Sequence, residues 1–236
     1  MFILAANPVF EAYRQSDFFG KTIFISLLFL SIITWVIFIK KWFIQRETKC
    51  KGSKIQEVFQ KNRLNPLGFD LSTFQLHPYS AIYQTLKQQT IELLNKNRSV
   101  AHDNKKVYLS RSDIDLIDAN LMTTISGQNK IYEKNLFILA TIVSLAPFLG
   151  LLGTVWGILL TFSELQQGVS ANANAAVMGG LAMALGTTVL GLLVAIPALI
   201  AYNSLKSSLA HIVTDMENFS HLLLASVEMQ YRKVDV

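Results

Sequence analysis

The sequence has little of what metal and redox sites need. Cys50 is the single cysteine among 236 residues, so the chain cannot form an internal disulfide. No C-x-x-C motif, H-E-x-x-H motif or paired cysteine–histidine cluster occurs. The four histidines, His77, His102, His211 and His221, lie far apart in polar segments, and we expect them to be solvated. These absences indicate that the chain is not an enzyme and binds no cofactor.

Charge is also missing over long stretches. The ranges 135–163 and 165–205 contain no charged residue, and Glu164 alone separates them. A shorter uncharged run covers Thr22 to Ile39. A helix of about 20 apolar residues crosses the hydrocarbon core of a bilayer, and backbone groups in lipid must pair within the segment. The sequence therefore predicts an all-α membrane protein with three transmembrane helices.

The positions of the basic residues predict the orientation of these spans. Residues 40–134 carry 16 Lys and Arg against 9 Asp and Glu, whereas residues 163–173 carry no basic residue. Basic segments stay preferentially in the cytoplasm, which predicts an N-out/C-in protein. The predicted segments are a periplasmic leader at 1–17, a first span at 18–39, a cytoplasmic helical domain at 40–134, a second span at 135–162, a periplasmic loop at 163–173, a third span at 174–203 and a cytoplasmic C-terminal helix at 204–236.

The polar segments show helical periodicity of their own. One helix is expected over Ser80 to Asn95, and a second should begin near Ser112, with Asp115 completing a capping-box-like pair. We expect the second helix to continue through Tyr132 into the second span. Apolar residues recur at helical spacing at Ile114, Ile117, Leu121 and Ile125, and again at Leu205, Leu209, Ile212, Met216, Phe219, Leu223 and Val227. These stripes predict long helices that extend into a cytoplasmic helical bundle.

Small residues and prolines mark the second and third spans. Small residues let helix backbones approach closely in lipid, and a proline removes one backbone donor and can kink a helix. By themselves they predict tight helix packing. The candidate packing and kink residues are Pro147, Gly150, Gly153 and Gly157 in the second span, and Gly186, Gly191 and Pro197 in the third.

Three hydroxyl groups lie in the middle of these spans, on Thr154, Thr187 and Thr188. A threonine in a helix can bond to the carbonyl four residues earlier, or it can line a narrow polar path. Sequence spacing leaves both alternatives open. The spans hold no ionisable residue apart from Lys21 and Glu164 near their ends, so a proton path would need a titratable group from another protein.

Two runs carry a family resemblance: APFLGLLGTVWGILLTF at 146–162 and LAMALGTTVLGLLVAIPALIAYN at 181–203. They resemble the MotA/TolQ/ExbB proton channel family, in its TolQ/ExbB branch. The resemblance implies a homo-oligomeric ring, commonly a pentamer, in the bacterial inner membrane. It also implies a single-span ExbD/TolR-like partner with a membrane aspartate, and a TonB- or TolA-like protein that the proton gradient drives.

The resemblance also suggests which residues line the channel. Thr154 and Thr188 match the family's channel-facing threonines, and Thr187 and Met183 are added as lining candidates. Met183 stands where the family usually has a glutamate, in an A-E-A-L context.

Alternative functions remain open at this stage. Because methionine cannot titrate, the chain could be a non-conducting membrane scaffold for single-span partners. A small-molecule permease is disfavoured, since few polar groups converge within the spans. The basic run from Lys40 to Lys54 is explained by topology and by attraction to anionic membrane lipid, so no nucleic-acid binding is expected. The sequence leaves the choice between TonB-like import and Tol-like envelope maintenance open.

Overall fold

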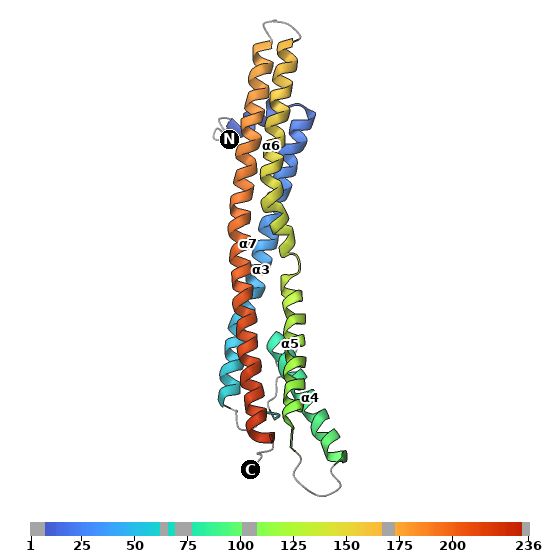
Figure 1. Ribbon diagram of the computed structural model, residues 1–236. Helices are drawn as coiled ribbons and strands as arrows, with labels where there is room; N and C mark the ends of the chain where they lie inside the picture. Colours follow the sequence, from blue (N-terminus) through green and yellow to red (C-terminus); the bar gives the residue numbers. More distant parts are fainter. Residues whose placement is uncertain (1–7, 62–65, 69–76, 101–107, 167–172, 233–236) are drawn as a thin grey trace. The chain divides into compact units, whose positions relative to one another are not determined.

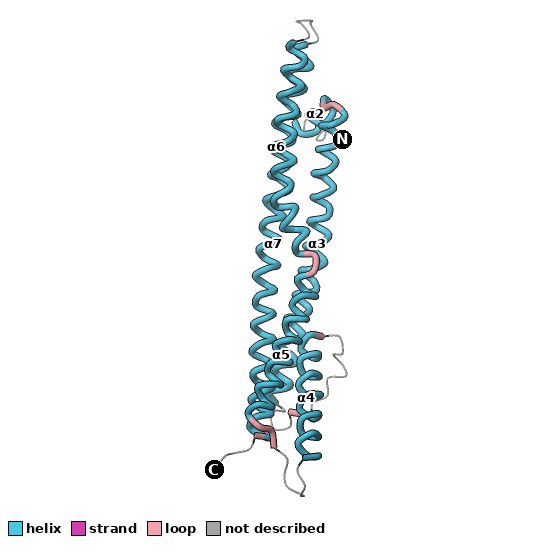
Figure 2. The backbone as a smooth tube through the Cα atoms, turned by 45° about the vertical axis from the view of Figure 1, so that its right-hand side comes forward, coloured by secondary structure: helices cyan, strands magenta, loops and turns pink. Residues whose placement is uncertain are grey.

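Six helices account for most of the residues that the computed structural model describes, which are 8–61, 66–68, 77–100, 108–166 and 173–232. These residues form no strand, only one isolated bridge between Leu109 and Arg232 (Figure 2). The helices are α2 (Pro8–Gln15), α3 (Phe18–Lys61), α4 (Pro78–Val100), α5 (Arg111–Glu133), α6 (Leu136–Gln166) and α7 (Ala173–Tyr231) (Figure 1).

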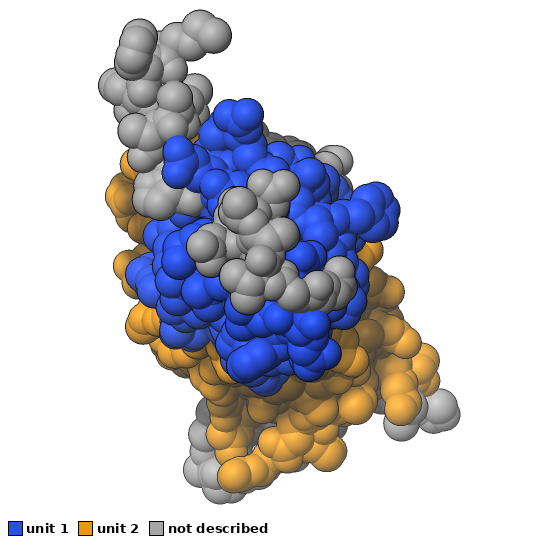
Figure 3. All heavy atoms as spheres, turned by 90° about the horizontal axis from the view of Figure 1, so that it is seen from above, with its two compact units in different colours: residues 1–41, 135–205 blue, residues 42–134, 206–236 orange. Residues whose placement is uncertain are grey.

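The helices divide between two compact units (Figure 3). Unit 1 comprises Met1–Lys41 and Asn135–Leu205, and unit 2 comprises Trp42–Lys134 and Lys206–Val236. Long helices α3 and α7 therefore contribute residues to both units. The exposed thiol of Cys50 belongs to the part of α3 in unit 2.

Unit 1 contains the apolar segments that the sequence predicts to span a membrane. Among the described residues, three helices are long and apolar enough to do so: Phe18–Lys61, Leu136–Gln166 and Val177–Tyr231. They overlap the expected spans at 18–39, 135–162 and 174–203, whose boundaries stay a prediction. Large apolar side chains such as Phe148, Leu185 and Ile200 are well exposed on this unit. An apolar surface of this kind is expected where lipid or another membrane helix covers it. Its interior includes Ile23, Leu27, Ile142, Ala146, Val194, Ala195 and Ala198.

Unit 2 is a helical bundle with a continuous apolar core. The α5 stripe predicted from the sequence is buried at all four positions, as is the α7 stripe from Leu205 to Val227. Phe59 of α3 and Tyr79 of α4 both contact Phe219 of α7 through their rings. The core residues of this unit are Ile55, Phe59, Tyr79, Ile82, Tyr83, Leu86, Leu93, Leu109, Ile114, Ile117, Leu121, Ile125, Ile212, Met216, Phe219, Leu223 and Val227.

The leader and the loops differ in extent from the sequence-based boundaries. Within the range of the expected leader, Pro8–Gln15 form a helix, α2, and the helix expected over Ser80 to Asn95 is longer at both ends. Ser163 belongs to α6 and Ala173 to α7, while 167–172 of the expected loop lie outside the described residues. The same holds for 101–107 of the polar connection between α4 and α5.

The predicted start of α5 was two residues too late. Its N-cap is Ser110, whose extended backbone (φ −79°, ψ 166°) precedes the helix. The Ser110 hydroxyl accepts the Asp113 N–H at 3.2 Å, and the Asp113 carboxylate accepts the Ser110 N–H at 2.9 Å. The capping box is therefore Ser110 with Asp113. Ser112 and Asp115 carry the same residue pattern, but both lie inside the first turns of the helix.

Replacing Ser110 with alanine should cost about 1 kcal/mol of stability, because the alanine side chain leaves the Asp113 N–H without its capping acceptor. Asp115→Asn is the matched control, since the Asp115 side chain is exposed and caps nothing; its effect should stay within about 0.5 kcal/mol. Urea unfolding of the full-length protein in detergent, followed by circular dichroism, measures both. Equal losses in the two variants would contradict this assignment of the cap.

The expected continuation of α5 through Tyr132 into the second span was wrong. Helix α5 ends at Glu133, and α6 begins at Leu136. Between them Asn135 has a φ of 72°, in the left-handed region. Asparagine enters this region more readily than most residues, and a left-handed residue ends the repeating helical hydrogen bonds. The apolar pattern is continuous across this point, so it carries no sign of the break.

Candidate functional site

Helix α6 and the part of α7 in unit 1 run side by side (Figures 1 and 2). Glycines lie where the two helices meet. Gly150, Gly153 and Gly157 are buried on α6. A Cβ atom on Gly157 would lie 2.5 Å from the Gly180 carbonyl oxygen, and one on Gly191 would lie 2.8 Å from the Ala146 carbonyl oxygen. The two backbones are therefore in direct contact, which only residues without a side chain permit. We call this line of contact the glycine seam.

Thr187 lies inside the glycine seam. Its side chain is fully buried and occupies the space that a Gly153 side chain would need. Its hydroxyl lies within bonding distance of the Met183 and Ala184 carbonyls, each at 3.0 Å, and of the Gly150 carbonyl of α6 at 3.4 Å. A hydroxyl has one proton to donate, so these three carbonyls share it. In this chain Thr187 links α7 to α6.

Thr154 and Thr188 are placed differently, because both are half-buried at the margin of the helix pair. The Thr154 hydroxyl donates to the Leu151 carbonyl at 2.6 Å, and the Thr188 hydroxyl donates to the Ala184 carbonyl at 3.3 Å. A hydroxyl that donates within its own helix keeps lone pairs that can accept from water. These two side chains therefore offer polar acceptors on otherwise apolar helices.

Met183 is fully buried on another side of α7. It packs in a small cluster with Ala12 of α2 and Phe24 of α3. Gly20 of α3 leaves the room for it, since a Cβ there would lie 2.5 Å from the Met183 sulfur. Gly186, one turn further along α7, similarly leaves room for Ala12 of α2, since a Cβ on Gly186 would lie 2.8 Å from the Ala12 Cβ. Helix α2 is thus seated on α7 through small residues.

Both prolines stand inside helices that continue past them. Pro147 cannot donate to the Val143 carbonyl, and Pro197 cannot donate to the Leu193 carbonyl, so each helix lacks one bond. Pro197 also lines an apolar groove of about 300 Å³ between α3 and α7, together with Trp35 and Phe38. The kinks expected at these prolines remain a prediction.

Residues 85–218, more than half of the chain, match the model of the MotA/TolQ/ExbB proton channel family. The chain belongs to this family. All eleven candidate site residues, from Pro147 to Pro197, lie within the matched range, including the glycine seam and the mid-span threonines. The channel-lining role of Thr154, Thr187, Thr188 and Met183 stays a prediction.

Several relatives in this family carry the name ExbB. The "Biopolymer transport protein ExbB" of Pseudomonas putida is 28% identical over 226 residues, covering 93% of this chain and 64% of the relative. That of Salmonella typhimurium is 29% identical over 197 residues, covering 83% and 76%. That of Helicobacter pylori strain J99 is 50% identical over 90 residues, covering 38% and 61%. The chain thus spans less than two thirds of the length of the Pseudomonas and Helicobacter relatives.

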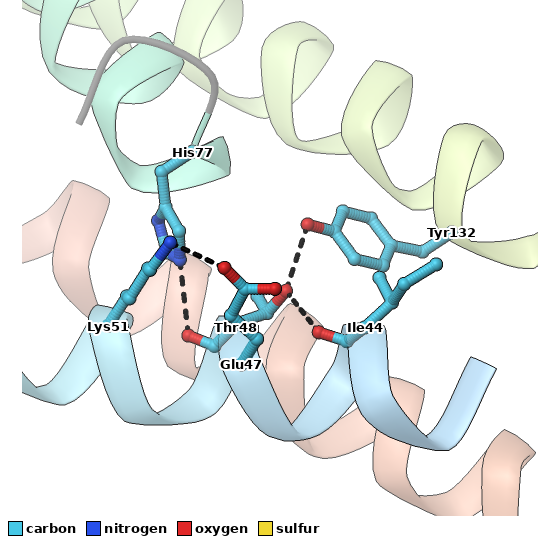
Figure 4. Close-up of polar contacts among 6 residues, drawn as sticks. All are labelled: Ile44, Glu47, Thr48, Lys51, His77 and Tyr132. Atoms are coloured by element: carbon cyan, nitrogen blue, oxygen red, sulfur yellow. Dashed lines mark hydrogen bonds and ion pairs between the residues drawn. The ribbon is translucent and has the colours of Figure 1, made fainter. Parts of the chain in front are cut away.

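This member of the MotA/TolQ/ExbB family also has a polar cluster in unit 2 that the sequence did not indicate (Figure 4). His77, expected to be solvated, is buried at the start of α4, and its Nε2–H donates to the Thr48 carbonyl of α3 at 3.2 Å. The Thr48 hydroxyl in turn bonds to the Tyr132 hydroxyl of α5 at 3.0 Å. Lys51 and Glu47 form an ion pair beside them. The cluster joins three helices of the bundle.

Burial lowers the pKa of His77, against the opposing effect of its bond to Thr48. The imidazole is therefore neutral near pH 7. His211 and His221 are exposed, as expected, while His102 lies outside the described residues. No group of three His, Cys, Asp or Glu residues that could hold a metal occurs in the described part of the chain.

Proposed function

We propose that this protein is a ring-forming proton channel subunit of a TolQ/ExbB-type motor in the bacterial inner membrane. The motor would couple the proton gradient to the motion of a TonB- or TolA-like protein that acts on the outer membrane. The ring would be a homo-oligomer, with a pentamer as the expected form. Family membership and the ExbB names of the relatives support this proposal.

The observation that carries the proposal is the pair of half-buried threonines on the α6–α7 pair. Thr154 and Thr188 place hydroxyl oxygens on helices whose described residues in unit 1 carry one charge, the exposed Glu164. Such a lining can hold water but cannot itself take up a proton at neutral pH. A single-span ExbD/TolR-like partner with a membrane aspartate would supply the titratable group.

The proposed topology is N-out/C-in. It places residues 1–17 and 163–173 in the periplasm, the spans 18–39, 135–162 and 174–203 in the membrane, and residues 40–134 and 204–236 in the cytoplasm. The excess of basic residues in 40–134 supports this orientation. Lys40 and Lys41 would lie at the surface of the membrane, where anionic lipid attracts basic side chains.

A second candidate function is a non-conducting scaffold that holds single-span partners. Two observations favour it: Met183 cannot titrate and is fully buried, and both half-buried threonines bond within their own helices. In that case the ring would contact the partner helices without wetting a path beside them.

Proton flux in the unmodified protein separates the two functions, and replacing Thr188 with valine tests the part that this threonine plays in a channel. Valine keeps the shape of threonine and removes the oxygen that accepts from water, so proton flux should fall by about fivefold to tenfold, for a loss of about 1–1.4 kcal/mol. Flux is measured in vesicles containing the full-length protein and its co-purified partner. Thr22→Val is the control, because Thr22 is an exposed α3 threonine whose hydroxyl also bonds within its own helix.

The scaffold function makes the opposite prediction for the same vesicles. Proton flux should then stay at the background of protein-free vesicles in the unmodified protein, although ring and partner purify together. Unchanged flux in the Thr188 variant, with clear flux in the unmodified protein, would remove Thr188 from the pathway and leave the channel function standing.

A further inference from the structure

One carboxylate of unit 1 is held against the membrane helices. Asp17 lies between α2 and α3, and its Oδ2 atom accepts the indole Nε1–H of Trp156 in α6 at 3.1 Å. The same side chain caps α3, because Oδ1 accepts the Gly20 N–H at 2.9 Å and Oδ2 accepts the Phe19 N–H at 3.3 Å. The Phe19 ring also packs against the Trp156 ring, with the ring centres 4.6 Å apart and the ring planes tilted by 50°. A cap needs only the two backbone donors, so the indole is an additional, specific partner.

The carboxylate also lies close to Met183. A Cβ atom on Gly20 would lie 3.0 Å from the Asp17 Oδ1 atom and 2.5 Å from the Met183 sulfur. The Asp17 and Met183 side chains thus approach the same point on α3 from two sides. Asp17 brings a titratable group to the neighbourhood of Met183, where α7 offers a thioether only.

In the part of the chain that the structure describes, no cation forms an ion pair with the Asp17 carboxylate. Glu11 and Arg14 on α2 and Glu164 on α6 are exposed, and α7 carries no charged residue as far as Leu205. Lys21, one turn along α3, is half-buried, and no ion pair joins a cation to Asp17 within the described residues. Of the three carboxylates in the described part of unit 1, Asp17 alone is half-buried. Neutral N–H groups hold it, and none of them can give up a proton near pH 7.

We propose that Asp17 is a proton-binding residue of this chain, and that its carboxylate releases Trp156 when it takes up a proton. This inference rests on the proposed channel function. The ionised carboxylate is a strong, charge-assisted acceptor for the indole N–H, whereas the protonated carboxyl group is neutral and accepts more weakly. Proton uptake therefore weakens this hydrogen bond and loosens the contact between Asp17 and α6. The proton comes from water at the N-terminal side of α3 and is returned to water or to the partner's carboxylate.

The experiment measures proton flux over a series of pH values in vesicles that contain the full-length protein and its co-purified partner. Asp17→Asn keeps an oxygen for Trp156 and remains a good N-cap, but it cannot titrate. We expect flux to fall by about tenfold or more while ring and partner still purify together. Adding Met183→Glu to this variant returns a carboxylate to the same place and should restore much of the flux. Glu11→Gln, which removes an exposed carboxylate of α2, is the control and should leave flux unchanged.

A second variant tests the link to Trp156. Trp156→Phe keeps an aromatic ring against Phe19 and removes the indole N–H. Because the ionised carboxylate then loses one donor, the midpoint of the flux–pH curve should move to higher pH. A purely structural contact would lower the flux without moving this midpoint. If Asp17→Asn fails to assemble, the midpoint measured for Trp156→Phe still tests whether Asp17 binds the proton.

The outcomes distinguish this inference from the proposed function. Suppose that the unmodified protein conducts protons and that Asp17→Asn has the same flux and the same pH curve. This result would overturn the role of Asp17 and leave the channel function standing. An unmoved midpoint in Trp156→Phe would overturn the proposed release of Trp156. Background flux in the unmodified protein would refute the channel function, and the role of Asp17 with it.

Discussion

Replacing Phe219 with alanine is expected to lower the free energy of unfolding of unit 2 by about 3–5 kcal/mol. The Phe219 side chain is fully buried, and its ring centre lies 5.8 Å from that of Phe59 and 5.2 Å from that of Tyr79. Truncation removes these contacts and leaves a cavity where α3, α4 and α7 meet. Chemical unfolding of the full-length protein in detergent, followed by circular dichroism, measures the loss.

Met229→Ala is the matched control for this prediction, because Met229 lies on the same helix and its side chain is 80% exposed. Its effect should stay within about 0.5 kcal/mol. If the Phe219 variant lost no more stability than the Met229 variant, Phe219 would not lie in the core of the bundle.

Adding a single methyl group in the glycine seam should lower the stability of the protein almost as much as truncating Phe219. Gly157→Ala is expected to cost about 1–3 kcal/mol, because the new Cβ would lie 2.5 Å from the Gly180 carbonyl oxygen. A backbone atom cannot turn aside as a side chain does, so α6 and α7 must separate. The thermal stability of the purified full-length protein in detergent should fall accordingly, and proton flux should fall with it.

Gly127→Ala is the control for the seam. Gly127 lies inside α5, and a Cβ there would have no atom within 4 Å. Alanine in a helix interior loses less backbone entropy on folding than glycine, so this variant should gain about 0.5–1 kcal/mol. A glycine-to-alanine substitution is thus expected to lower the stability at Gly157 and to raise it at Gly127. A gain at Gly157 would show that the helices do not touch along the seam.

The three long apolar helices and the core stripes could be predicted because both depend on regular patterns. An uncharged run marks a span, and the spacing of Ile114, Ile117, Leu121 and Ile125 marks the buried face of α5. What the apolar patterns could not give was where a helix ends once it leaves the apolar region: α3 runs on to Lys61 through many charged residues. The left-handed Asn135 was missed for a similar reason, since nothing in the apolar pattern changes there.

The contacts within the candidate site were less predictable, because they join residues far apart in the sequence. Of two adjacent threonines, Thr187 lies in the seam and Thr188 at its margin, and only the rotation of α7 against α6 decides which. His77 was expected to be solvated because its partner, Thr48, lies 29 positions away on another helix. Asp17 and Trp156 are 139 positions apart, and the cap that Asp17 forms gives no hint of the indole.

The exposed thiol of Cys50 gives this protein a single chemical handle. Since no other cysteine occurs in the sequence, a maleimide dye or spin label attaches at one place without any substitution. That place is the polar part of α3, in unit 2. A reagent that cannot cross the bilayer reaches the thiol from one face alone, so the native protein carries its own marker of membrane orientation.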